Sequence, residues 1–162
     1  DLMNMPLGDF TRGRETRPFE FDGQRIRPTI CYEDLFGEEL AANFVGEAQA
    51  TVIANVSNIG WFGPTEAVDQ HLQISRLRAL EFQRPLVRAT NTWATAVIDH
   101  RGRVSAWLAP HTQGVLVGEV EGREGSTPYA RWVSALALWP LLALALGILG
   151  AAAWRRSRRV GA

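Results

Sequence analysis

Short apolar runs bounded by turn residues alternate with amphipathic stretches over the first 120 residues. This pattern predicts an α/β fold with a mixed sheet. The most continuous run, 50–56 (ATVIANV), is typical of a strand buried on both faces. Further strands are predicted at 19–21, 25–31, 86–89, 95–99, 104–108 and 115–120, with turns at 22–23 and 100–103.

Two helices are predicted among these strands. Apolar residues spaced four apart predict a short helix over 38–44. A longer helix is predicted from the N-cap Thr65 to about Gln83, where Pro85 stops it. Two helices cover little sheet surface, so we expect that the first 130 residues do not close a core of their own.

The most apolar segment lies near the C-terminus, where 132–154 contains no charged residue. As one helix it would be about 34 Å long, enough for a bilayer core of about 30 Å. Trp132 and Trp154 stand at its ends, as in the aromatic belts of membrane helices. A buried core helix is the alternative. We expect a transmembrane helix at 132–154, after a linker at 126–131.

The flanking charges predict the orientation of this helix. Four arginines follow it within the basic tail 155–162, whereas Arg131 stands before it. The positive-inside rule therefore places the tail in the cytoplasm and the first 130 residues on the opposite face. In a bacterium this is the inner (plasma) membrane, with the catalytic part in the periplasm.

The charge pattern excludes several function classes. The 17 basic and 17 acidic residues balance, which argues against a nucleic-acid partner. All 17 basic residues are arginine, and the chain has no lysine. The three histidines lack metal-ligand spacing, so we interpret them as solvated or capping side chains and predict neither metal nor cofactor. The absence of a G-x-S-x-G motif argues against a serine hydrolase.

The single cysteine, Cys31, ends the predicted strand 25–31 and precedes a helical stretch. A thiol at a helix N-terminus is favoured as the reactive thiolate. A buried structural cysteine is the alternative, because free cysteine is among the most buried residue types. The nearest histidine is forty residues away, so the spacing gives no support for a Cys-His dyad.

Several motifs of the chain resemble one enzyme family. Residues 30–36 (ICYEDLF) resemble the cysteine motif of the nitrilase, or carbon–nitrogen hydrolase, superfamily. Within it, the resemblance is closer to the bacterial apolipoprotein N-acyltransferases. The segments that match that group follow in its order along nearly the whole chain: 55–63, 71–81, 84–92 and 127–132.

This resemblance implies a partial nitrilase-like α-β-β-α sandwich followed by one C-terminal transmembrane helix. It implies a Glu-Lys-Cys triad in which Cys31 is the nucleophile, while the glutamate and lysine lie upstream of the matched region. Since the chain has no lysine, we expect it to be the C-terminal part of a longer enzyme, with 1–125 completing the catalytic domain. Alone, it is expected to be inactive.

The implied reaction moves a fatty acyl chain between two lipids. Cys31 would attack a phospholipid ester to form a thioester, and the amine of a diacylglyceryl-cysteine apolipoprotein would then take the acyl group. The resemblance assigns supporting roles to Tyr32 and Glu33 and substrate contacts to Asn58, Trp61 and Phe62. Helix capping by Glu33, and ordinary packing by Tyr32, Trp61 and Phe62, are the alternatives.

Three residues depart from the family pattern: Ile59, Trp93 and Gln113. The first and second flank expected active-site loops and so affect substrate fit. Two other functions remain open. One is a membrane-anchored amidase or nitrilase that uses the same cysteine on a small C–N substrate. The other is a non-catalytic fragment, which the missing lysine favours for this chain alone.

Overall fold

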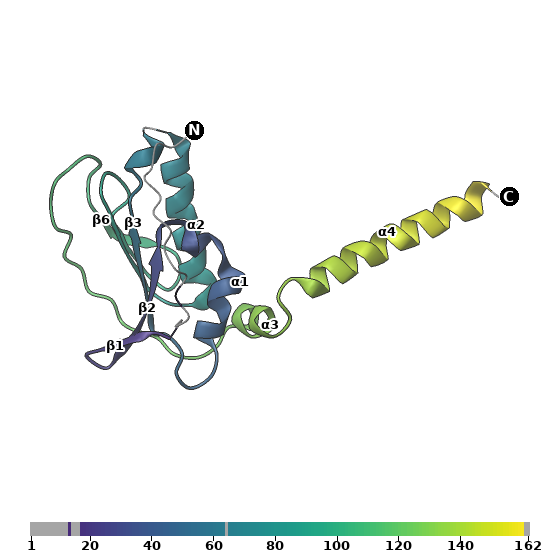
Figure 1. Cartoon of the computed structure of the whole chain (residues 1–162), viewed down its shortest axis with the longest axis horizontal. Helices are drawn as coiled ribbons and strands as arrows, with labels where there is room; N and C mark the ends of the chain where they lie inside the picture. The colour runs from purple at the N-terminus through teal and green to yellow at the C-terminus, as the bar shows by residue number, and fades with distance from the viewer. Residues whose placement is uncertain (1–12, 14–16, 64, 161–162) are drawn as a thin grey trace.

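A computed structural model describes residues 13, 17–63 and 65–160; the first twelve residues of the predicted catalytic segment lie outside this part. A six-stranded mixed sheet forms its centre, with the strands side by side in chain order (Figure 1). The three central pairings β2–β3, β3–β4 and β4–β5 are parallel, parallel and antiparallel, and both outer pairings are antiparallel. The strands are β1 (Phe19–Phe21), β2 (Gln24–Ile30), β3 (Val52–Ser57), β4 (Leu86–Thr90), β5 (Ala96–Ile98) and β6 (Val104–Trp107).

The structure confirms six of the seven predicted strands to within two residues at most ends, together with both turns. Asp22 and Gly23 have φ values of 48° and 73°, as a two-residue hairpin with positive φ at both positions requires. In the second turn Asp99 Oδ1 accepts the backbone N–H groups of Arg101 and Arg103. These turns therefore set the register of β1 on β2 and of β5 on β6.

The longer predicted helix is α2 (Glu66–Phe82), which begins after Thr65 and ends at Gln83 in the left-handed conformation with φ 54°. The shorter one is only partly α-helical: α1 (Gly37–Leu40) passes directly into the 3₁₀ helix η2 (Ala41–Phe44). Two further 3₁₀ helices, η1 (Cys31–Leu35) and η3 (Gly60–Phe62), follow β2 and β3. Of these helices, η1 packs against α2 and against β2 and β3.

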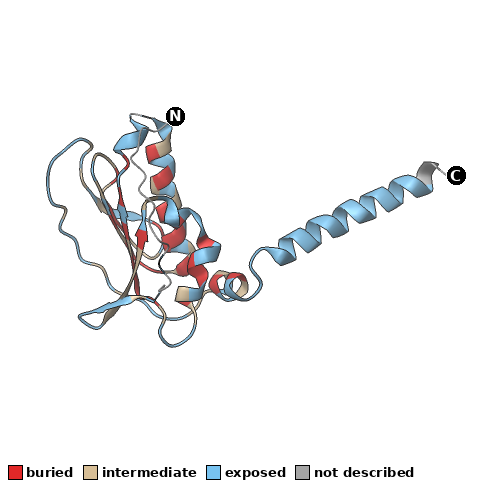
Figure 2. Ribbon diagram, viewed as in Figure 1, coloured by how far each residue is buried: buried red, intermediate tan, exposed pale blue. Residues whose placement is uncertain are grey.

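The core lies between one face of the sheet and the helices (Figure 2). Ile53, Leu86 and Ile98 supply the sheet side and are fully buried. From the helical layer, the rings of Phe44 and Phe82 stack on each other, 4.1 Å apart between centroids, in the same core cluster. The chain therefore forms a closed core on this face of the sheet, although the first 130 residues were not expected to close one.

The opposite face differs from the prediction of a strand at 115–120. Those residues form no strand; they run along the sheet on the side away from α2 (Figure 1). A Cβ on Gly118 would meet Cγ2 of Val97 at 2.9 Å, so the segment crosses side chains of β5 instead of joining an edge. A cavity of about 510 Å³ separates it from the sheet. Val56 is 52% exposed, so β3 is not buried on both faces along its whole length.

The uncharged segment 132–154 does not form one continuous helix, because two helices replace it. They are α3 (Pro128–Leu136) and α4 (Trp139–Val160). Pro140 lacks an N–H and would clash with the carbonyl of the fourth preceding residue, which is why α3 ends at Leu136. Ala137 then takes a φ of 48°.

The two helices meet at an angle of 80°. Ala130 and Val133 anchor α3 in the core, whereas α4 projects away and is exposed along its described side chains (Figure 2). Within the described ranges, neither helix alone has the length and apolar character to cross a membrane; the bent pair together has both.

Candidate active site

Cys31 follows the last residue of β2 and begins η1, partly exposed, with a free thiol. Its φ is 52°, in the left-handed region, which costs an L-residue about 1–2 kcal/mol. Two side chains hold its carbonyl oxygen in this conformation. Asn55 Nδ2 donates to it at 3.0 Å from β3, and His71 Nε2 lies 3.1 Å from it on α2.

The helix that follows Cys31 is a five-residue 3₁₀ turn, not the α-helix whose dipole was expected to favour thiolate. Glu33 Oε2 accepts the N–H of Ile30 at 2.8 Å, which is the capping contact considered for it. Tyr32 is 64% exposed and meets Phe36 edge-on at 6.4 Å between centroids, so it is not a core aromatic. Both residues adjoin the nucleophile candidate, one by capping and one at the surface.

Beneath Cys31 lies a buried polar cluster, which we call the Asp34 cluster: Asp34, Asn55, His71, Ser75 and Arg88. Asp34 is fully buried. Its Oδ1 is 3.0 Å from His71 Nε2, and its Oδ2 accepts from the Ser75 hydroxyl at 2.5 Å. A buried carboxylate requires such donors to offset its lost hydration.

Arg88 supplies the positive charge of this cluster from β4. Its Nη1 donates to Ser75 Oγ at 2.6 Å and to Asn55 Oδ1 at 3.1 Å, and lies 3.5 Å from Asp34 Oδ2. Burial lowers the pKa of Arg88, and the negative charges of Asp34 and Cys31 act in the opposite direction. Among the described residues, Nε and Nη2 of Arg88 have no hydrogen-bond partner.

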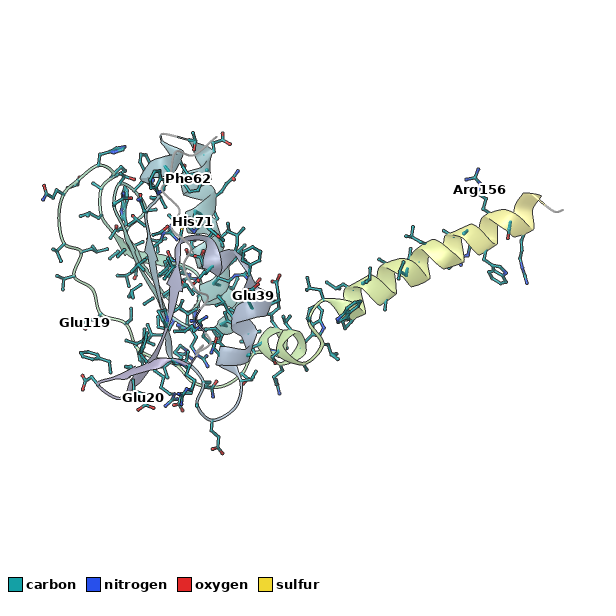
Figure 3. The ribbon with its side chains drawn as sticks, in the orientation of Figure 1. Glu20, Glu39, Phe62, His71, Glu119 and Arg156 are labelled. Carbon is teal, nitrogen blue, oxygen red and sulfur yellow. The ribbon has the colours of Figure 1, made fainter. Side chains whose placement is uncertain are left out.

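The interpretation of the histidines as solvated or capping side chains is wrong for His71, which is 5% exposed. From α2 its ring contacts Cys31 and Asp34 of η1; Figure 3 labels the residue. The sequence did carry a signal: His71 and Ser75 stand four apart on one helix face, and Asp34 is three residues after the cysteine. None of these residues was singled out as a site residue from the sequence.

A second polar contact holds the loop after β3. Asn91 Oδ1 accepts the N–H groups of Ile59 at 3.0 Å and Gly60 at 3.2 Å, and its Nδ2 donates to Asn58 Oδ1 at 2.7 Å. Ile59 is fully buried in a small cluster with Val68, and Trp93 packs against that cluster. Ile59 and Trp93, the two departures from the family pattern near this loop, therefore both belong to the apolar packing that supports it.

The aromatic residues of this loop are on the surface. Trp61 is 55% exposed and Phe62 41% exposed, so core packing does not explain either of them. Figure 3 shows Phe62 at the same end of the molecule as the start of α2. The loop adjoins an open groove of about 490 Å³ at the carboxyl ends of β2, β3 and β4, lined in part by Ile30, Asn58 and Asn91. Ligands of α/β sheets bind at this edge.

The chain is similar to bacterial acyltransferases over most of its length. It is 62% identical over 141 residues to an apolipoprotein N-acyltransferase of Verminephrobacter eiseniae, covering 82% of this chain and 26% of the relative. The identity to the protein of that name from Ralstonia nicotianae is 53% over 163 residues, covering 99% of this chain and 30% of the relative. The chain thus spans less than a third of the relatives it matches.

Solved structures share the fold. A CN-hydrolase superfamily protein from Xanthomonas campestris superimposes with a TM-score of 0.58 at 19% identity, over 80% of this chain and 51% of that one. An amidase of the nitrilase superfamily from Nesterenkonia gives 0.51 at 19% identity, over 65% of this chain and 41% of its own. The family model described as carbon-nitrogen hydrolase matches residues 4–129. The chain, with its cysteine at the carboxyl end of a central strand, therefore belongs to the carbon–nitrogen hydrolase family.

Proposed function

We propose that this chain is part of an apolipoprotein N-acyltransferase and that Cys31 carries the fatty acyl chain as a thioester. The observation that supports this most is the similarity to relatives of that name, which extends through both the cysteine motif and the C-terminal helices. Cys31 directly follows Ile30, which lines the open groove at the strand ends, and this position supports a nucleophile that accepts a large substrate.

In the proposed reaction the Cys31 thiolate attacks the ester carbonyl of a phospholipid. The sulfur–carbon bond forms, the ester C–O bond breaks, and the departing lysophospholipid oxygen takes the proton that the Cys31 thiol gave up. The free amine of a diacylglyceryl-cysteine apolipoprotein then attacks the thioester, so that an amide forms and the thiol is released. The glutamate and lysine of the expected triad would come from elsewhere in the full-length protein.

Other residues of this chain have proposed roles in binding and support. Trp61 and Phe62 are exposed next to the groove and would contact the acyl chain, since apolar surface there gains by leaving water. Asn58 lines the groove and offers a polar contact. Glu33 supports the nucleophile by capping Ile30, directly before Cys31, and Tyr32 supports it from the surface beside it.

The C-terminal helices would keep the site at the membrane surface, where both lipid substrates reside. We propose that the bent pair of α3 and α4 forms the anchor of 132–154: α3, whose Ala130 and Val133 are buried in the core, would lie at the membrane surface, and the apolar part of α4 would enter the membrane. The arginines of the tail 155–162 would then lie in the cytoplasm and the catalytic part in the periplasm. Residues 126–131 would link this anchor to the catalytic part.

The test uses the full-length protein and a phospholipid with a labelled acyl chain. The wild type should gain label that neutral hydroxylamine removes, and label should then pass to the amine of a diacylglyceryl lipopeptide. Cys31→Ala should gain none. Label that persists on Cys31→Ala would refute the nucleophile assignment. Hydrolysis of small amides without any acyl-thioester would favour the amidase alternative.

A further inference from the structure

The backbone of Cys31 is held by residues from two other elements. Its carbonyl accepts from Asn55 on β3 and contacts His71 on α2, 24 and 40 positions away in the sequence. A positive φ is unfavourable for cysteine, so it persists only where the surroundings impose it. If the carbonyl lost these donors, the residue would relax, and the direction of its Cα–Cβ bond would change with it.

The proton of His71 is fixed by what its Nε2 faces. A carbonyl oxygen and the carboxylate of Asp34 can only accept, so Nε2 carries the hydrogen and donates to both. This nitrogen is therefore not a free base for the thiol. Ser75 and Arg88 hold Asp34 from its other oxygen, and the carboxylate in turn holds the imidazole.

We propose that the Asp34–His71 pair, together with Asn55, is a positioning device that fixes the left-handed backbone of Cys31 and so aims its thiol at the acyl carbonyl. This inference rests on the proposed role of Cys31 as nucleophile. His71 and Asn55 are positioning residues because they act on the cysteine carbonyl and not on substrate. An error of about 1 Å in such a placement can cost about 100-fold in rate.

The electrostatics of the cluster agree with this arrangement. Burial lowers the pKa of Arg88, and the negative charges of Asp34 and Cys31 act to raise it. Arg88 also bonds Asn55, one of the two donors to the Cys31 carbonyl. One buried cation is thereby linked to both donors, through Asn55 directly and through Asp34 to His71.

The test compares two substitutions of His71 in the full-length protein. His71→Leu removes the donor, whereas His71→Gln places an amide N–H near the position of Nε2. At saturating phospholipid, single-turnover acylation of Cys31 should fall about 10- to 100-fold in His71→Leu and stay within about 3-fold of wild type in His71→Gln. KM for the phospholipid should stay unchanged in both. His100→Leu, in the turn after β5, is the matched control and should acylate as wild type.

A second readout separates this inference from the proposed function. Alkylation of Cys31 by iodoacetamide needs no acyl donor, and its rate should fall at least several-fold in His71→Leu and recover in His71→Gln. Asn55→Asp removes the other donor at constant size and should lower the rates of both alkylation and acylation of Cys31. If the wild type forms no thioester, the proposed function fails and the alkylation series still decides this inference. The inference would be overturned if a folded His71→Leu variant were alkylated and acylated at wild-type rates. It would also be overturned if His71→Gln lost as much of both rates as His71→Leu does.

Discussion

The side-chain amide of Asn91 donates to Asn58 Oδ1 at 2.7 Å and so joins the residues that directly follow β4 and β3. The same side chain accepts the N–H groups of Ile59 and Gly60 through Oδ1. One asparagine therefore fixes the base of the loop that carries the exposed aromatic residues. This relationship makes the loop testable independently of catalysis.

Asn91→Ala should release this loop. It leaves the backbone N–H of the buried Ile59 without its acceptor, at a cost of about 1–3 kcal/mol, while the N–H of Gly60 keeps Asn58 Oδ1 at 3.3 Å. Chymotrypsin should then cleave after Trp61 or Phe62 several-fold faster than in the wild type. Asn91→Asp keeps the acceptor and should be cleaved at an intermediate rate. Equal cleavage of Asn91→Ala and wild type would show that the contact does not restrain the loop.

The left-handed backbone of Cys31 predicts an unusual order of stabilities. Because its φ is 52°, Cys31→Gly should be more stable than Cys31→Ala by about 1 kcal/mol. Cys31→Val should be the least stable, since β-branched residues tolerate positive φ worst. Thermal unfolding of the three full-length variants in detergent measures this order. A valine variant as stable as the glycine variant would mean that the backbone relaxes at this position.

Local patterns were enough to predict much of the fold. The helix α2 could be predicted because its start after Thr65 and its end before Pro85 are both marked by residues next to it in the sequence. The strand predicted at 115–120 was wrong because alternating valines give the same pattern whether or not the segment pairs with a sheet. Val115 and Val117 are 87% and 85% exposed. Pro140 accounts for the break between α3 and α4, but the burial of Ala130 and Val133, which keeps α3 in the core, could not be read from composition.

The candidate site was predictable only in part. Cys31 was identified as the single cysteine at the end of the predicted strand 25–31 and by its motif, and the structure places it directly after β2. The Asp34 cluster was missed because Asp34 contacts His71 and Ser75, which lie 37 and 41 positions away in the sequence. Asn55 also stood inside a run that was interpreted as apolar strand. Only the pairing of β2 with β3 brings Asn55 next to Thr29 and the cysteine carbonyl.

Arg84 should be among the most important residues for stability. Its buried guanidinium donates to the carbonyls of Ala50, Phe82 and Gly125 and to the side chain of Gln49. Burial lowers its pKa to about 10, yet it stays charged at neutral pH. Arg84→Met leaves those acceptors without a donor and should cost on the order of 3 kcal/mol.

Arg84→Lys should recover only part of this loss, because one ammonium cannot reproduce a planar fork. Arg101→Met, at an exposed turn position, is the matched control and should change the free energy of unfolding by about 0.5 kcal/mol or less. Denaturant unfolding of the full-length variants gives the comparison. A small effect of Arg84→Met would show that water replaces the lost donors.

The turn between β5 and β6 should contribute pH-dependent stability through Asp99. Burial acts to raise the pKa of this carboxyl, but the backbone N–H groups of Arg103 and Arg101 outweigh it, and the pKa lies below the usual value. The folded state therefore favours the carboxylate. Its contribution is complete above the unfolded pKa of about 3.9 and is lost as pH falls through the lower folded pKa.

Asp99→Asn tests this because the amide oxygen can still accept both N–H groups, so that only the charge is removed. The variant should unfold at a lower temperature than wild type at pH 7, and the difference should shrink as the pH falls below about 4. Thermal unfolding of both full-length proteins at pH 7 and pH 3 provides the measurement. A difference that is the same at both pH values would show that the carboxylate charge contributes nothing, and that only the shape of the turn does.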